Sequence, residues 1–289
     1  MIVTVTCNPA IDKTIYENKV VYDIGGKGIN VSKVLNNLNS KSIVTGFIGR
    51  DNKDIVINDL NSLNIDNHFI EVDGRVRTNT KRIKNNQLFE ENEDGPYISE
   101  SKINELFNYL KCFSNDIVII SGSTPSSVNK NIYFEMINLL KENNNYVILD
   151  CSKELLANAI KAKPNIIKPN KEEICELLEV EYDEKQIISK CKDLDIELIC
   201  LSLGEDGAIF IGEEINKCNA LNIKCSSSVG AGDAMVAAIA YGIENKYDEE
   251  SIIKLAMAAS GTACETIGTK PPKYKEIMDK INDVIIIKQ

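Results

Sequence analysis

Short apolar runs of strand length alternate with stretches of helical periodicity along much of this 289-residue chain. Ile117–Ile120, Tyr146–Leu149 and Glu197–Leu201 are near-continuous apolar runs. Between the first two, residues 132–140 place their large apolar side chains at helical spacing. Buried strands that alternate with amphipathic helices indicate a parallel sheet covered by helices on both faces. We therefore predict an α/β fold of three layers, α/β/α, around a central, mostly parallel sheet.

The N-terminal part of the chain fits the same sheet. Ile2–Thr6 and Ile43–Ile48 have the composition of buried strands, and a helix is expected between them from about Asn30. Residues 69–91 differ, because their extended runs are short. With residues 13–24 they are expected to form a small antiparallel β-lid on a single domain, 1–289. The expected extended runs are Lys19–Tyr22, Phe69–Val72, Thr78–Ile83 and Gln87–Phe89, with a turn at Asn85–Asn86.

Composition excludes several classes of protein. The net charge is −10 and no basic stripe is present, which argues against a nucleic-acid partner. The sequence contains no run of eighteen apolar residues, so we expect no membrane span. The N-terminus has no basic segment before an apolar core, so we expect no secretory signal. Nine cysteines without a C-x-x-C pair, and a single histidine, favour reduced thiols in the cytoplasm over a zinc site or a disulfide framework.

The strongest chemical signal is Val229–Asp233, where glycines lead into an apolar helical pattern. Such a turn directs free backbone N–H groups and the positive end of the helix dipole at one point. We predict that Gly230, Ala231 and Gly232 form an anion hole there. Asp233 would be the base that accepts a proton from an attacking hydroxyl. The alternative is an ordinary helix start with Asp in its first turn. Neither a P-loop nor a G-x-G-x-x-G fingerprint occurs in the chain.

A second signal pairs the segment 8–12, after the first strand, with the glycine-rich segment 25–30. Asp12 there could accept hydrogen bonds from sugar hydroxyls. Gly25 and Gly26 would allow a ligand to approach the backbone closely, and Lys27 would supply a cation near a transferring phosphate. An ordinary turn residue and an ordinary loop are the alternatives for these two segments.

A third signal is the segment 168–173, in which Asn170 and Glu173 are three residues apart at an expected helix start. Their oxygen atoms suit Mg²⁺, held directly or through water. The alternative is a capping box. A fourth segment, 201–208, turns through Gly204 and Gly207, and it could pass under an adenine or ribose or form a plain hairpin.

Cations also gather on the expected lid, at Arg75, Arg77, Lys81 and Arg82. The alternation of a strand places Arg77, Asn79 and Lys81 on one face. That face could bind a sugar phosphate through charge-assisted hydrogen bonds. A solvated, charged edge strand is the alternative.

With these motifs in this order, the chain resembles the ribokinase-like carbohydrate kinases, also called the phosphofructokinase-B family. Within that family it is most similar to the branch of 1-phosphofructokinases and tagatose-6-phosphate kinases. The resemblance extends over nearly the whole chain, and its ordered set is far more specific than any one motif. The motifs that carry it are Thr4–Asp12, Gly25–Ser32, Ser121–Ser123, Ile167–Glu173, Ser202–Gly204 and Val229–Asp233.

The resemblance implies an ATP- and Mg²⁺-dependent kinase that phosphorylates a hydroxyl of a phosphorylated ketohexose, with fructose 1-phosphate as the first candidate. Asp233 matches the catalytic base of the family, and Gly230–Gly232 match its anion hole. The implied sugar-binding residues are Asp12, Gly25, Gly26, Lys27, Asn30, Arg77, Asn79 and Lys81. The implied nucleotide and metal residues are Lys168, Asn170, Glu173, Ser202, Gly204, Gly207 and Ala259.

The chain departs from the family pattern in its short stretch between Asp12 and Gly25, which is longer in most members. This stretch predicts a shortened lid, and the resemblance implies a homodimer that the family commonly builds through its lid. Three alternatives remain beside fructose 1-phosphate: a tagatose-6-phosphate kinase, a kinase of an unphosphorylated sugar or nucleoside, and a non-catalytic sugar-phosphate sensor. The retained Asp233 argues against the sensor, because binding alone does not need a base.

Overall fold

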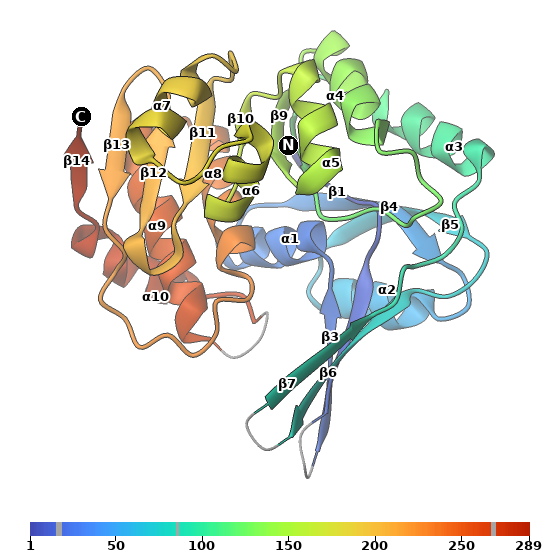
Figure 1. Cartoon of the computed structure of the whole chain (residues 1–289). Helices are drawn as coiled ribbons and strands as arrows, with labels where there is room; N and C mark the ends of the chain where they lie inside the picture. Colours follow the sequence, from blue (N-terminus) through green and yellow to red (C-terminus); the bar gives the residue numbers. More distant parts are fainter. Residues whose placement is uncertain (16–18, 85–86, 267–269) are drawn as a thin grey trace.

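The computed structural model describes residues 1–15, 19–84, 87–266 and 270–289. Its main body is a ten-stranded sheet with helices on both faces, and a second, four-stranded sheet projects from it as a lid (Figure 1). The main sheet is parallel from β5 through β11 and antiparallel beyond. In spatial order its strands are β14 (Ile286–Lys288), β13 (Ile215–Cys218), β12 (Ala208–Ile211), β11 (Leu198–Ser202), β10 (Ile166–Ile167), β9 (Tyr146–Asp150), β8 (Ile117–Ser121), β1 (Ile2–Thr6), β4 (Ser42–Gly49) and β5 (Asp66–Val72).

Apolar side chains of the central strands alternate between two separate cores. In β1, Val3 and Val5 pack in the core under helices α3 to α7, whereas Ile2 packs in the core under α1 and α8 to α10. This alternation confirms the predicted three-layer α/β/α fold. The helices are α1 (Lys27–Asn37), α2 (Lys53–Ser62), α3 (Glu100–Leu110), α4 (Ile132–Glu142), α5 (Lys153–Ala159), α6 (Lys171–Leu178), α7 (Glu184–Lys192), α8 (Ala231–Glu244), α9 (Glu249–Glu265) and α10 (Tyr274–Lys280), with short 3₁₀ turns at Ile160–Ala162, Gly204–Asp206 and Ile281–Asp283.

The lid is a four-stranded sheet in the order β3, β2, β6, β7. It is not purely antiparallel as predicted, because β2 and β6 run parallel and only the outer pairs are antiparallel. Segments 13–24 and 77–92 both contribute to it, and the expected turn at Asn85–Asn86 lies outside the described residues. The lid strands are β3 (Val20–Gly25), β2 (Ala10–Ile15), β6 (Arg77–Lys84) and β7 (Gln87–Asn92).

The placement of Phe69–Val72 in the lid was wrong. These residues belong to β5, the edge strand of the main sheet, which pairs in parallel with β4. Ile70 and Val72 are 2% exposed and pack in the core under α3, while Phe69 packs on the opposite side. Within the described residues, no helix is long and apolar enough to cross a membrane.

Candidate active site

The start of helix α8 carries the residues of the glycine-rich motif. Gly230 caps the helix with a φ of 85°, a left-handed conformation that glycine adopts without strain. The first amides of a helix have no partner within it and can bind an anion. A side chain at Gly232 would lie 3.0 Å from Nζ of Lys168, so the Lys168 ammonium lies directly beside this turn. Backbone N–H groups and a cation thus converge on one point.

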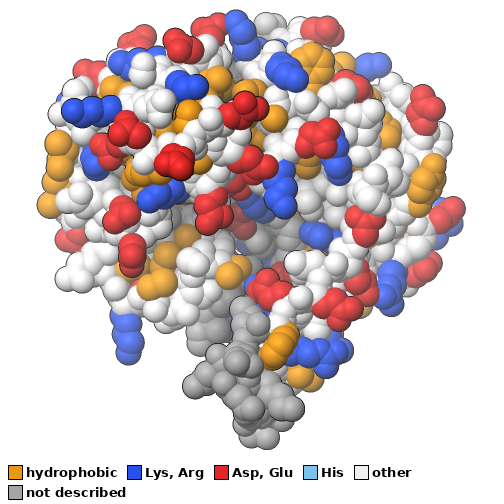
Figure 2. Space-filling view, viewed as in Figure 1, with side chains coloured by type: hydrophobic (Ala, Val, Ile, Leu, Met, Phe, Trp, Pro, Cys, Tyr) orange, Lys and Arg blue, Asp and Glu red, His pale blue; other side chains and the backbone are white. Residues whose placement is uncertain are grey.

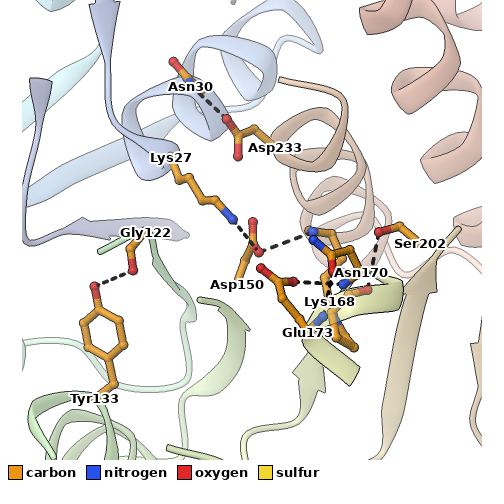
Figure 3. Close-up of polar contacts among 11 residues, drawn as sticks. Lys27, Asn30, Gly122, Tyr133, Asp150, Lys168, Asn170, Glu173, Ser202 and Asp233 are labelled. Atoms are coloured by element: carbon orange, nitrogen blue, oxygen red, sulfur yellow. Dashed lines mark hydrogen bonds and ion pairs between the residues drawn. The ribbon is translucent and has the colours of Figure 1, made fainter. Parts of the chain in front are cut away.

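Asp233, in the first turn of α8, is 6% exposed. Its Oδ2 accepts a 2.8 Å hydrogen bond from Nδ2 of Asn30, in the first turn of α1 (Figure 3). Burial, reinforced by the negative charge of Asp150, raises the pKa of Asp233 to about 6, although Lys27, Asn30 and Lys168 act in the opposite direction. A carboxylate with a pKa near neutrality is suited to accept a proton at physiological pH.

Asp150, at the end of β9, joins two lysines from different elements (Figure 3). Its Oδ1 lies 2.9 Å from Nζ of Lys27 and 3.3 Å from Nζ of Lys168. Burial by itself would raise the pKa of Asp150, but the two ammonium groups outweigh it and hold the pKa below its ordinary value. Two cations therefore share one buried carboxylate, and the cluster keeps a net positive charge that suits a phosphate.

Asn170 and Glu173 form the capping box that was one of the two interpretations of this segment. The Asn170 backbone N–H donates to Oε2 of Glu173 at 2.9 Å, and the Glu173 N–H donates to Oδ1 of Asn170 at 2.8 Å. The Glu173 side chain points toward Asp150 (Figure 3). The capping box uses Oε2 of Glu173 and does not involve Oε1. Nearby, Oδ2 of Asp150 is buried without a hydrogen-bond partner among the described residues. These oxygen donors fit Mg²⁺, which prefers carboxylates, water and substrate phosphates.

A cavity of about 850 Å³ opens beside the start of α8. Five of the six residues that the sequence assigned to a nucleotide line this cavity. The exception is Ala259, which is fully buried inside α9. Ser260 and Gly261 form the cavity wall at that point. The apolar part of the wall includes Leu221, Ile223 and Met257. The predicted residues in the wall are Lys168, Asn170, Ser202, Gly204 and Gly207, together with Ala231 and Gly232.

A second cavity, of 210 Å³, is lined by Gly26, Lys27 and Arg77 among others. Three buried oxygen atoms at its wall have no hydrogen-bond partner among the described residues. They are Oγ1 of Thr6, Oδ1 of Asn8 and Oγ of Ser121. Unpaired buried polar atoms are costly unless a ligand satisfies them, so this cavity suits a polyhydroxylated molecule.

Asp12 lies on β2 at the base of the lid, where Oδ1 accepts a 2.9 Å hydrogen bond from Nδ2 of Asn79 on β6. A side chain at Gly25 would lie 2.2 Å from Oδ2 of Asp12, so a larger residue there would displace this carboxylate. Burial raises the pKa of Asp12 above its ordinary value, against the effect of Asn79 and the lid cations.

The two predicted lid cations differ in their surroundings. Arg77 lines the smaller cavity and donates from Nε to the Asn8 carbonyl at 3.3 Å. Lys81 lies farther out on β6 and pairs with Glu90 at 3.4 Å across the lid. Figure 2 shows that this face of the molecule is hollowed above the lid and that acidic and basic side chains border the hollow.

Sequence reasoning missed Asp150, Thr6 and Asn8 as site residues. A signal for Asp150 was present, because this carboxylate directly follows the apolar run of β9 and the carboxyl ends of parallel strands converge on the ligand crevice. Thr6 occupies the same position on β1. A threonine at a strand end is too common to be distinguished without the neighbouring strands.

Comparison with known proteins gives consistent matches over most or all of the chain. A family described as pfkB family carbohydrate kinase matches residues 1–276. A 1-phosphofructokinase of Borreliella burgdorferi is 36% identical over 281 residues, which cover 91% of each chain. The structure of a candidate phosphofructokinase from Staphylococcus aureus matches with a TM-score of 0.88 at 30% identity, covering 100% of this chain and 99% of that one. Phosphofructokinase-2 of Escherichia coli, solved in complex with potassium, shares the fold with a TM-score of 0.90 at 22% identity over 98% of each chain.

Proposed function

The chain belongs to the pfkB family of carbohydrate kinases, and on that premise we propose that it transfers the γ-phosphoryl group of ATP to a hydroxyl of fructose 1-phosphate, giving fructose 1,6-bisphosphate. The observation that carries the proposal is the position of Asp233. It directly follows Gly232, which lines the larger cavity, and it accepts a hydrogen bond from Asn30, one helical turn after Lys27, which lines the smaller one. A base in this place can reach a hydroxyl that faces a bound nucleotide.

In the proposed reaction, Asp233 accepts the hydroxyl proton as the sugar oxygen attacks the γ-phosphorus in line. The amides at the start of α8 and the ammonium groups of Lys27 and Lys168 stabilise the charge on the transferring group. Because the protein already holds these groups in place, little reorganisation accompanies the reaction. When bound, Mg²⁺ would neutralise nucleotide phosphate charge, held by Asp150, Asn170 and Glu173 directly or through water.

Two features support a sugar phosphate as the acceptor. The smaller cavity combines three oxygen atoms that have no hydrogen-bond partner within the described part of the chain, which suit sugar hydroxyls, with the cations of Lys27 and Arg77, which suit a phosphate. The Borreliella relative is a 1-phosphofructokinase. Tagatose 6-phosphate, an unphosphorylated sugar and a nucleoside are the acceptors against which the proposal is tested.

The test is ADP release with purified protein across fructose 1-phosphate, fructose 6-phosphate, tagatose 6-phosphate, fructose, ribose and a nucleoside. We expect the highest kcat/KM with fructose 1-phosphate. A higher value with another acceptor would replace the proposed substrate. Ligand binding without ADP release from any acceptor, measured as a shift in Tm, would instead show a sensor.

We propose further that the enzyme works in the cytoplasm as a homodimer that pairs through its lids. All nine cysteines are free thiols, as is usual in that compartment.

The homodimer is proposed from the edge strand of the lid, β3. Its residues Val20 and Tyr22 are 47% and 60% exposed and lie on the same face of the strand. An apolar strand face of this kind favours pairing with a second copy. Light scattering of wild type and Tyr22→Lys tests this, and a wild-type mass of one chain would refute it.

A further inference from the structure

Two cysteines, Cys225 and Cys264, lie together in the wall of the nucleotide cavity. Cys225 is exposed and belongs to the loop between β13 and α8. Cys264 is half-buried and lies at the C-terminal end of α9. Neither thiol has a role in the proposed phosphoryl transfer.

The backbone holds these cysteines against one another. The carbonyl oxygen of Cys264 accepts hydrogen bonds from the N–H of Ser226 at 2.7 Å and from that of Ser227 at 3.1 Å. Ser226 directly follows Cys225, so the two backbones run in contact at this point. Burial, together with the adjacent thiol of Cys225, raises the pKa of Cys264 to about 11, which reflects the same proximity.

We propose that Cys225 and Cys264 form a reversible disulfide that narrows the nucleotide cavity when the enzyme meets a peroxide. The proposal rests on the assignment of this cavity to ATP. The exposed Cys225 is the thiol that a small oxidant reaches first, and the half-buried Cys264 is the one that resolves the product.

The chemistry needs one hydrogen peroxide for each disulfide. The Cys225 sulfur attacks a peroxide oxygen, the O–O bond breaks and hydroxide leaves, which gives a sulfenic acid on Cys225. The Cys264 sulfur then attacks the Cys225 sulfur, and the departing hydroxyl takes up a proton as water. In sum, two thiols and one peroxide give one disulfide and two waters. A dithiol such as dithiothreitol reverses the reaction.

The location of the bond explains its expected effect on the nucleotide. A disulfide holds its two sulfur atoms at about 2.05 Å, closer than two thiols in contact. It would tie the loop of Cys225 to the end of α9 across the wall that Leu221 and Gly261 form, where a side chain at Gly261 would already lie 2.8 Å from Leu221. The same loop leads into Gly230 of the anion hole. Oxidation should therefore weaken nucleotide binding, and bound nucleotide should shield both thiols.

The first experiment maps the disulfide. Protein treated with hydrogen peroxide, with and without a saturating non-hydrolysable ATP analogue, is digested without reduction and its linked peptides are identified by mass spectrometry. We expect a 225–264 linkage that dithiothreitol removes and that the analogue slows. This readout does not require kinase activity, so it separates failure of the inference from failure of the proposed function.

The second experiment measures KM for ATP before and after peroxide treatment, with each variant compared to itself. In wild type we expect KM for ATP to rise at least about fivefold, which is the lower end of the usual coupling between linked sites. Dithiothreitol should return KM to its original value. Cys225→Ser should show no such change. Cys112→Ser, which removes the other exposed cysteine of the described chain, should respond as wild type. Absence of the linkage, or an equal rise in KM in Cys225→Ser, would overturn the inference.

Discussion

The side-chain amide of Asn30 donates a 2.8 Å hydrogen bond to Oδ2 of Asp233, which connects the first turns of α1 and α8 across 203 residues of sequence. The bond stabilises the ionised form of a buried carboxylate and orients it. It also joins the helix that begins at Lys27 to the helix that begins after Gly230. The bond thus connects the starts of two helices that also pack against each other.

Replacing Asp233 by Asn should lower kcat by at least ~10²-fold, because the acceptor hydroxyl loses its base. Nucleotide affinity should stay close to that of wild type, since the amides of α8 are unchanged. ADP release and nucleotide-induced shifts in Tm measure the two effects. Asp248→Asn, at the exposed N-cap of α9, is the matched control and should retain activity. Near-normal turnover of Asp233→Asn would contradict the assignment.

The pH profile of kcat/KM should fall on the acid side with an apparent pKa near 6, because the reaction needs ionised Asp233 and its pKa is raised to about 6. Asn30→Ala removes a hydrogen bond that favours the charged form. The pKa of Asp233 should then rise further, and the acid limb should move to higher pH. Steady-state kinetics between about pH 5 and 8 measures the shift. An unmoved limb would show that another group controls the acid side.

Asp150→Asn should destabilise the protein, because Lys27 and Lys168 would then lie together near the active site without their shared counter-charge. Loss of one partner in a buried ion pair costs about 3–5 kcal/mol of the free energy of unfolding. Urea unfolding measures this change. Glu105→Gln breaks an exposed pair with Lys102 on α3 and should change stability by less than about 1 kcal/mol. Equal effects of the two variants would contradict the central role of Asp150.

Glu173→Gln separates the two roles of this residue. Glutamine can still close the capping box, so helix α6 should keep its stability. The loss of negative charge should raise the Mg²⁺ concentration for half-maximal activity by about 10-fold or more, as is common when a metal site loses a supporting group. A magnesium titration of activity measures it, with Glu176→Gln on the same helix as the control. An unchanged requirement for Mg²⁺ would leave Glu173 as a helix cap only.

Arg77→Ala should raise KM for fructose 1-phosphate by roughly 10-fold or more while fructose is affected far less, because a hydrogen bond to a charged group contributes about 1.5–3 kcal/mol. Kinetics with both acceptors gives the comparison. Arg75→Ala removes a cation two residues away that pairs with Glu93 outside the smaller cavity, so it should change neither value much. Equal losses for both acceptors would remove Arg77 from phosphate recognition.

Much of the fold was predictable because buried positions are apolar and recur at the regular spacing of helices and strands. The run Ile117–Ile120 is apolar at every position, since β8 is covered on both faces, and it was identified with its correct limits to within one residue. Phe69–Val72 was misplaced because a short run with one charged residue looks the same in a lid as at the edge of a sheet. Only the pairing of β5 with β4 distinguishes the two.

The sequence by itself determined which residues could act, because glycines before a helix and a carboxylate in its first turn carry their chemistry locally. Only the tertiary structure decided which of them meet. Asp150 and Lys168 meet because the parallel strands β9 and β10 end at one edge of the sheet. Lys27 reaches Asp150 from the start of α1, and Asn30 meets Asp233 because α1 packs against α8. The pKa values of Asp150 and Asp233 depend on burial and on neighbouring charges, which are properties of the folded chain and not of any one segment.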